Sequence, residues 1–279
     1  MHRVGGRVTN LFYSMPIWLA TIVVLAVALA IGLGVSIGIQ RLFRIKSTAE
    51  EKEVAVNLMQ VVAAYVGIMI AFAGVQVWQD FSDAKAAVAQ EAAAASQLYQ
   101  DLTIFGSETR PARSALRRYV VSITQDEWPM LADGNGSEVT EAALQRVFAE
   151  VGKLSPADNR ASSIYEEMLE KLNDLVDFRH DRIVESQEGI PLILWTIGLV
   201  GSLLTVAYSS AFTPTRFNVL AIGGISLTLG LVFLFILTVD HPFKGEFSVG
   251  DRHLAELSGT FDRLDRLALA DEGEVTMLK

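Results

Sequence analysis

The segment Val54–Trp78, VAVNLMQVVAAYVGIMIAFAGVQVW, contains twenty-five residues without a charge. It is followed from Ser82 to Gln100 by an Ala-rich stretch, SDAKAAVAQEAAAASQLYQ, that favours helix and contains neither Pro nor Gly. The hydrocarbon core of a membrane needs only about 20 helical residues. The sequence therefore predicts one long helix, residues 54–105, that crosses a membrane and continues into water.

One face of this segment is polar at both ends and apolar in the middle. At about 100° per residue, seven of its positions fall within about 80° of one another. These positions, called here the amide-ended stripe, are Asn57, Val61, Ala64, Ile68, Phe72, Val75 and Gln79. Amide side chains in hydrocarbon need a hydrogen-bonding partner or water, so we expect the stripe to face protein or an aqueous path. Helix packing through the amides and the lining of a pore both remain open.

The rest of the chain is also typical of a membrane protein. It has 279 residues, of which 51% are hydrophobic, and a mean hydropathy of +0.35. Its charge-free runs long enough to cross a bilayer are Pro16–Gln40, Val54–Trp78, Gly189–Thr215 and Phe217–Val239. The fold class predicted is an all-α, four-span membrane protein with a helical extramembrane region between the second and third spans.

This pattern divides the chain into four parts. Residues 1–81 hold an N-terminal tail and the first helix pair, 82–188 the extramembrane region, 189–243 the second pair, and 244–279 a C-terminal tail with a short helix at 252–269.

Turn and capping signals subdivide these parts further. Ser47 or Thr48 is expected to cap the second span. Within 82–188, helices are expected from Pro111 to about Trp128, over 139–154, and from a start capped by Ser155. Close helix packing is expected in the first span at the pair of small residues Gly34 and Gly38.

Composition and motifs exclude several classes of function. The absence of Cys removes thiolate metal sites and cysteine nucleophiles, and the net charge of −9 argues against nucleic acid as a partner. The four His residues are scattered, and there is no phosphate-binding glycine loop or nucleophile motif. We predict no enzyme activity, no catalytic residues, no metal site and no cofactor.

Three charged residues lie near the ends of the third and fourth spans. Asp240 follows the last apolar run, where it is interpreted as a capping or interfacial acid or as a charge at a pore mouth. Arg179 and Arg182 are expected to snorkel and to pair locally with Asp177, Asp181 or Glu185, with an anion-attracting ring as the alternative.

An even number of spans places both termini and the extramembrane region on one side of the membrane. Near the spans, Lys and Arg on that side outnumber those on the other by eight to five. The first set is Arg3, Arg7, Lys85, Lys171, Arg179, Arg182, Lys244 and Arg252, and the second is Arg41, Arg44, Lys46, Lys52 and Arg216. The positive-inside rule then predicts a multi-pass protein of the cell (inner) membrane whose extramembrane region is cytoplasmic.

The order and spacing of several short motifs resemble the bestrophin family of anion channels, and more closely the bacterial membrane proteins with a bestrophin-like domain. The resemblance extends from about residue 50 to residue 250. It rests on Gly67–Phe72 with Gln76, Trp78 and Asp80, on Glu91-Ala92 and Leu98-Tyr99, on Arg179–Arg182, on Trp195, and on Asp240–Gly245.

The resemblance implies a homo-oligomer, a pentamer in the family, in which the second span lines a central conduit for small ions. Its apolar neck would lie at Ala64, Ile68 and Phe72. Ala73 follows Phe72 where bestrophins usually have an Arg, so anion preference does not carry over. Few acidic residues follow Phe243, so calcium gating is not expected.

Two functions are consistent with these observations. The first is an oligomeric ion channel or channel-like protein whose partners are lipid, ions and further copies of the chain. The second is a non-conducting, membrane-anchored signalling or scaffold protein whose helical region binds a partner. The polar ends of the stripe favour the first, and the lack of charge within the second span favours the second.

Overall fold

The computed structural model describes the backbone of residues 12–44 and 47–277 and the side chains of residues 12–44 and 47–269. Every regular element in these ranges is helical, in agreement with the predicted fold class. The chain divides into two compact units. The membrane unit consists of residues 1–80 and 189–248, and the helical unit of residues 81–188 and 249–279.

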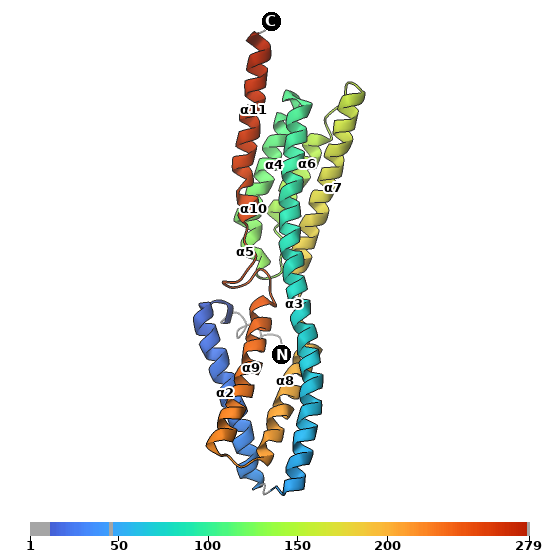
Figure 1. Cartoon of the computed structure of the whole chain (residues 1–279). Helices are drawn as coiled ribbons and strands as arrows, with labels where there is room; N and C mark the ends of the chain where they lie inside the picture. Colours follow the sequence, from blue (N-terminus) through green and yellow to red (C-terminus); the bar gives the residue numbers. More distant parts are fainter. Residues whose placement is uncertain (1–11, 45–46, 278–279) are drawn as a thin grey trace. The chain divides into compact units, whose positions relative to one another are not determined.

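The membrane unit is built from α2 (Ile17–Phe43), the first part of α3 (Ala49–Phe105), α8 (Leu192–Tyr208) with the 3-10 turn η3 (Ser209–Ala211), and α9 (Arg216–Val239) (Figure 1). Four stretches of the described chain are long and apolar enough to cross a membrane. They are α2, α3, the run Asn159–Ala211 that includes α8, and α9. The four predicted spans are therefore present.

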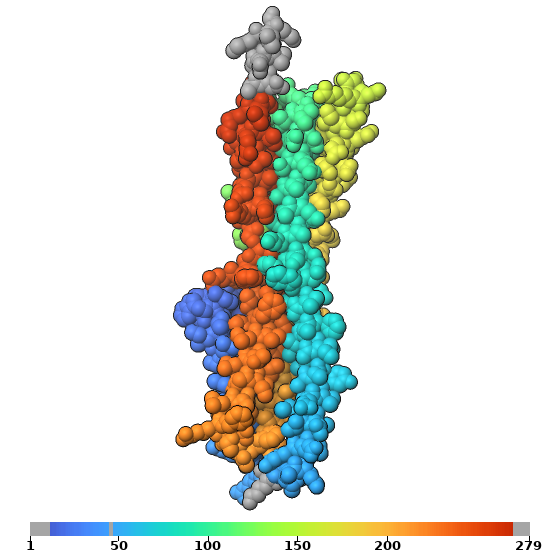
Figure 2. Space-filling view, viewed as in Figure 1, coloured from blue at the N-terminus to red at the C-terminus, as the bar shows by residue number. Residues whose placement is uncertain are grey.

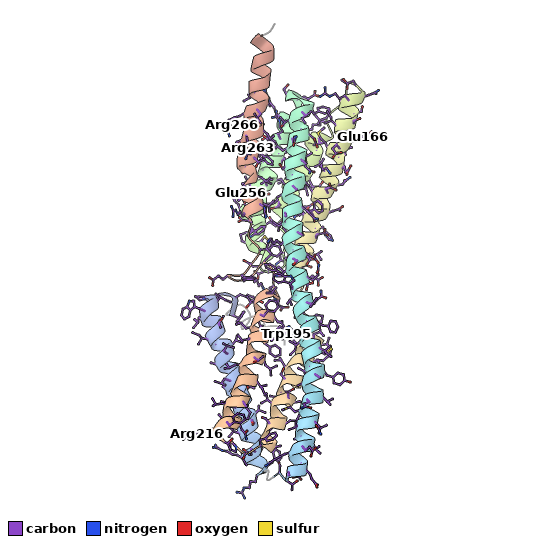
Figure 3. The ribbon with its side chains drawn as sticks, viewed as in Figure 1. Glu166, Trp195, Arg216, Glu256, Arg263 and Arg266 are labelled. Carbon is purple, nitrogen blue, oxygen red and sulfur yellow. The ribbon has the colours of Figure 1, made fainter. Side chains whose placement is uncertain are left out.

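Local chemistry sets where these helices begin. Before α3, the Thr48 N–H donates to Glu51 Oε2 over 2.7 Å, and the Glu51 N–H donates to Thr48 Oγ1 over 3.3 Å. This reciprocal pair is the expected capping box. At the turn that Arg216 marks in Figure 3, Thr215 caps α9 by accepting the Asn218 N–H.

Small residues allow close helix contacts, although not at the positions expected. A Cβ on Gly201 of α8 would lie 2.3 Å from a Val66 methyl of α3, and a Cβ on Gly32 of α2 would lie 1.9 Å from Ser226 Oγ of α9. A Cβ on Gly34 or Gly38 would meet nothing within 4 Å. These two glycines therefore make no close contact within the described chain, because they lie on the open side of α2.

The helical unit contains the second part of α3 together with α4 (Arg110–Ser122), the π-helix η2 (Ile123–Glu127), α5 (Trp128–Leu131), α6 (Glu138–Val151), α7 (Asn159–Gln187), α10 (Arg252–Ala255) and α11 (Leu257–Met277) (Figure 1). A 3-10 turn, η1 (Ser107–Thr109), connects α3 to α4. Ser137 caps α6 by accepting the backbone N–H groups of Val139 and Thr140.

One helix start in this unit differs from the prediction. The helix expected to begin after a Ser155 cap begins instead at Asn159, where Asp158 Oδ1 accepts the Ala161 N–H over 2.7 Å. Ser155 and Asp158 can both cap a helix, and the Asp158 side chain forms the cap here.

The C-terminal helices pack within the helical unit. The Phe261 ring of α11 stacks on the Tyr99 ring of α3 with a centroid distance of 4.0 Å. Asp265 accepts hydrogen bonds from Tyr99, Arg113 and Arg117. The residues that follow Val249 cluster with this unit.

Candidate functional site

The amide-ended stripe lies on the uncovered face of α3 in the membrane unit. All seven of its residues are exposed, and the central pair, Ile68 and Phe72, are 55% and 66% exposed. In the space-filling view, the membrane part of α3 is uncovered along its outer side (Figure 2). Side chains of this size are usually buried, so the face is available to lipid or to another protein surface.

The opposite face of α3 holds the helix in the bundle. Val66, Ile70, Ala73 and Val77 are each at most 7% exposed. Val66 lies against Gly201 of α8, and Ile70 lies 3.8 Å from the Cβ position of Gly198. Because residues i and i+4 lie on one side of a helix, these contacts direct the stripe away from its own chain.

Polar groups distinguish the stripe from an ordinary lipid-facing surface. Asn57 and Gln79 are exposed at its two ends, as are the flanking Gln60 and Gln76. Gln76 Nε2 donates to Asp80 Oδ1 over 2.6 Å. Amides at both ends of an apolar centre are compatible with water at both ends of the helix face.

A second candidate feature is a buried charge cluster inside the helical unit. Arg182 of α7 donates to Glu91 Oε2 of α3 over 2.6 Å and to Glu127 Oε1 over 2.7 Å. Arg179 donates to Glu127 Oε2 over 2.6 Å and also binds Glu141 of α6. Tyr119 donates to Glu91 Oε1 over 2.6 Å. The cluster therefore joins α3, α4, α6, α7 and the π-helix.

Burial and charge act in opposite directions on the pKa values of this cluster. Burial of Glu127 acts to raise its pKa, but the Arg179 hydrogen bonds and the Arg182 charge outweigh it and lower the pKa. Burial likewise acts to lower the pKa of Arg182, and the carboxylates of Glu91 and Glu127 raise it. Burial first, and the Glu91 charge second, raise the pKa of Tyr119. Glu127 and Arg182 are thus held in their charged forms at neutral pH.

The expected local pairing of Arg179 and Arg182 is wrong. Arg182 is fully buried and Arg179 is 9% exposed. This face of α7 packs into the core of the unit, so neither side chain snorkels towards water. Their carboxylate partners come from other helices, and the sequence pattern predicts neither Glu91 nor Glu127 as a partner. Arg179 and Arg182 continue, at helical spacing, the apolar face of Met168, Leu172 and Leu175, and this continuation is the signal that could have indicated buried partners.

Asp240 directly follows α9, and its side chain binds groups of the same chain. Its side chain is buried, and Oδ1 accepts the Ile190 N–H over 2.8 Å in the segment that leads into α8. Its Oδ2 lies 3.2 Å from His241 Nδ1. Asp240 therefore links the end of α9 to the start of α8. Over the residues that the structure describes, no group of three or more His, Asp or Glu side chains could hold a metal ion.

These features define a helical membrane protein with four candidate spans and a separate helical unit. A family model described as the Bestrophin-like domain matches residues 26–254. The chain belongs to this family.

Solved structures support the same fold at low identity. A bacterial bestrophin homolog from Klebsiella pneumoniae, solved with a point mutation, has a TM-score of 0.61 and 16% identity, covering 91% of this chain and 99% of that one. A second structure, described as a membrane protein, has a TM-score of 0.60 and 15% identity, covering 90% of this chain and 97% of that one. No curated protein matches the sequence.

Proposed function

We propose that the chain assembles into a homo-oligomeric ion channel in which the amide-ended stripes of the copies face a common axis. The observation that carries this proposal is the two-sided character of α3. Its stripe is exposed along the whole span, whereas the opposite side is packed against α8 of the same chain. Membership of the Bestrophin-like domain family supports a channel-like function.

The chemistry of the stripe matches what a conduit through a membrane requires. In a symmetric ring, Asn57 and Gln79 would each repeat as a polar ring near one end of the span. Ala64, Ile68 and Phe72 would repeat as apolar rings between them, about one helical turn apart. A narrow apolar ring can close a conduit by dewetting, because ions inside it cannot replace their lost hydration.

Cysteine cross-linking tests this arrangement directly, because the native chain has no Cys. Single cysteines at Val61, Ile68 and Val75 should form disulfide-linked dimers in membranes. Cysteines at Val66 and Ile70, on the packed face, are the matched controls and should not cross-link. The reverse pattern would refute a shared axis at this stripe.

A projection image of the detergent-solubilised protein separates the channel from the scaffold alternative. A ring of copies with an axial hole is expected for a channel. A particle without such a hole would favour a membrane-anchored protein that acts by binding a partner through its helical unit.

We also infer that the helical unit is cytoplasmic, on the basis of the eight-to-five excess of Lys and Arg. Arg3, Arg7 and Lys46, which contribute to that count, lie outside the described residues. The turn between α6 and α7 is a suitable site for a topology reporter, because Lys153 and Ser155 are exposed there. A reporter that works only in the extracytoplasmic space should be inactive at this turn, and activity there would reverse the orientation.

A further inference from the structure

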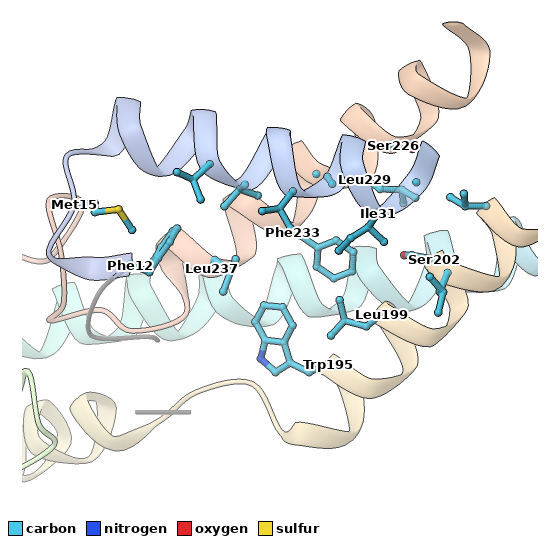
Figure 4. A pocket seen from close by; sticks show the side chains of 18 of the residues that line it. Phe12, Met15, Ile31, Trp195, Leu199, Ser202, Ser226, Leu229, Phe233 and Leu237 are labelled. Atoms are coloured by element: carbon cyan, nitrogen blue, oxygen red, sulfur yellow. The ribbon is translucent and has the colours of Figure 1, made fainter. Parts of the chain in front are cut away.

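A groove in the membrane unit lies between α2 and α8, with α9 as its floor. Its volume is about 460 Å³, within the range of about 300–1,000 Å³ found for small-molecule sites. Ile31 of α2, Leu199 of α8 and Phe233 of α9 point into it (Figure 4). Ile31 and Leu199 are about half exposed, so the groove is open to the surrounding hydrocarbon.

One polar atom in this groove has no partner. Ser202 is 8% exposed and lines the groove, and its Oγ is the one buried hydroxyl without a hydrogen bond among the described side chains. Six other hydroxyls on α2, α8 and α9 donate to the carbonyl four residues earlier. They are Thr21, Thr196, Thr205, Ser226, Thr228 and Thr238. A buried hydroxyl left unpaired in hydrocarbon costs free energy, so Ser202 is placed to receive a partner from the groove.

The position of Ser202 restricts what that partner can be. Ser202 lies ten residues after Leu192, the start of α8, which is about 15 Å along the helix axis. Because the hydrocarbon core is about 30 Å thick, Ser202 lies near its middle. The ester carbonyls of a phospholipid remain near the membrane surface. A free ligand that supplies the acceptor must therefore dissolve entirely in the hydrocarbon.

The walls of the groove favour a flat ring. Trp195 of α8 and Phe233 of α9 both line it, and their rings stack on each other, with an interplanar angle of 18° and a centroid distance of 6.1 Å. Aromatic surfaces pack well against conjugated rings. We propose that the groove binds a membrane-soluble quinone, with a ring carbonyl accepting the Ser202 hydroxyl proton and an apolar tail along α2. This binding site does not depend on ion conduction.

Equilibrium binding of tritium-labelled decylubiquinone to the full-length protein in detergent tests the proposal. Unlabelled decylubiquinone should compete for the site, and decylbenzene, which lacks a carbonyl, should compete about three- to tenfold less well. Ser202→Ala should weaken quinone binding by about the same factor and remove the difference between the two competitors. Equal competition by decylbenzene in the unmodified protein would mean that the groove accepts any apolar chain, and would overturn the proposal.

Three further variants keep the test decisive. Ser202→Thr retains a hydroxyl and should bind like the unmodified protein, which controls for a folding defect in Ser202→Ala. Thr196→Val removes a hydroxyl of α8 that is satisfied within its own helix and should leave binding unchanged. Val27→Phe should fill the groove and abolish saturable binding. Quinone binding that survives both Ser202→Ala and Val27→Phe would place the ligand elsewhere and refute the site.

Discussion

Arg182 donates through Nε to Glu91 Oε2 over 2.6 Å, and both side chains are completely buried in the helical unit. Nη2 of the same guanidinium binds Glu127, and its carbon atom Cζ lies 5.9 Å from the centre of the Trp128 ring. A charge taken out of water in this way is stable only while its partners remain. This pair therefore holds α7 to α3 inside the helical unit.

Removing one member of the pair should destabilise the protein strongly. Arg182→Met leaves Glu91 and Glu127 buried with fewer partners, so we expect a loss of about 3–5 kcal/mol of stability. Thermal unfolding followed by circular dichroism in detergent measures this loss. The double variant Arg182→Met/Glu91→Gln should lose less than the two single variants together, because one uncompensated charge is removed.

A surface ion pair provides the control for this prediction. Arg252 and Glu256 form a pair of similar length, 2.8 Å, but their side chains are 86% and 60% exposed. Arg252→Gln should leave the unfolding temperature unchanged, since exposed pairs contribute little. An effect as large as that of Arg182→Met would contradict the view that burial makes the Arg182 cluster important.

The same cluster predicts loss of stability in acid. The pKa of Glu127 is lower in the folded protein than its ordinary value of 4.5, so the unfolded chain binds its proton more readily. The stabilisation from Glu127 is then complete above about pH 5 and is lost as the pH falls below 4.5 through the lower folded pKa. Unfolding temperatures measured from pH 7 down to about pH 3 should fall with a shallower slope in Glu127→Gln. An identical slope would show that other carboxylates account for the acid sensitivity.

Close packing between α3 and α8 is the basis of a third prediction. Gly201→Ala places a methyl group 2.3 Å from a Val66 methyl, and Val66 has little rotamer freedom to move away. We expect a destabilisation of about 1–3 kcal/mol, typical of overpacking. Gly34→Ala is the matched control, because its added methyl meets nothing within 4 Å. Equal unfolding temperatures for the two variants would show that α3 and α8 adjust at no cost.

Hydrophobic pattern and capping chemistry predicted the helices of this chain well, because both signals are local. The charge-free run at 54–78, its Ala-rich extension and the Thr48–Glu51 capping box together indicated α3, which the structure extends over Ala49–Phe105. The face of α3 that carries Asn57 and Gln79 followed from helical periodicity alone. Both residues are exposed.

Contacts between distant segments could not be predicted in the same way. Arg182 and Glu91 are 91 residues apart in sequence, and nothing local indicates that they pair. The unpaired hydroxyl of Ser202 could not be predicted either. Ser202, Thr196 and Thr205 all lie in the same apolar run, and only their surroundings in the fold differ. Tertiary packing decides both cases.

The last prediction concerns the narrowest part of the proposed conduit. Ile68 and Phe72 lie one turn apart on the exposed face of α3, so in a ring of copies each would form an apolar collar. The double variant Ile68→Ala/Phe72→Ala should widen these collars, and leak conductance in reconstituted bilayers should rise because a wider collar stays hydrated. Ile193→Ala/Leu220→Ala, which truncates two exposed side chains of α8 and α9, is the matched control and should leave conductance unchanged. If the Ile68 and Phe72 side chains were instead packed between helices, each truncation would cost about 2–5 kcal/mol and the oligomer would lose stability without gaining conductance. That result would mean that Ile68 and Phe72 belong to a packing interface and not to a neck, and it would favour the scaffold function.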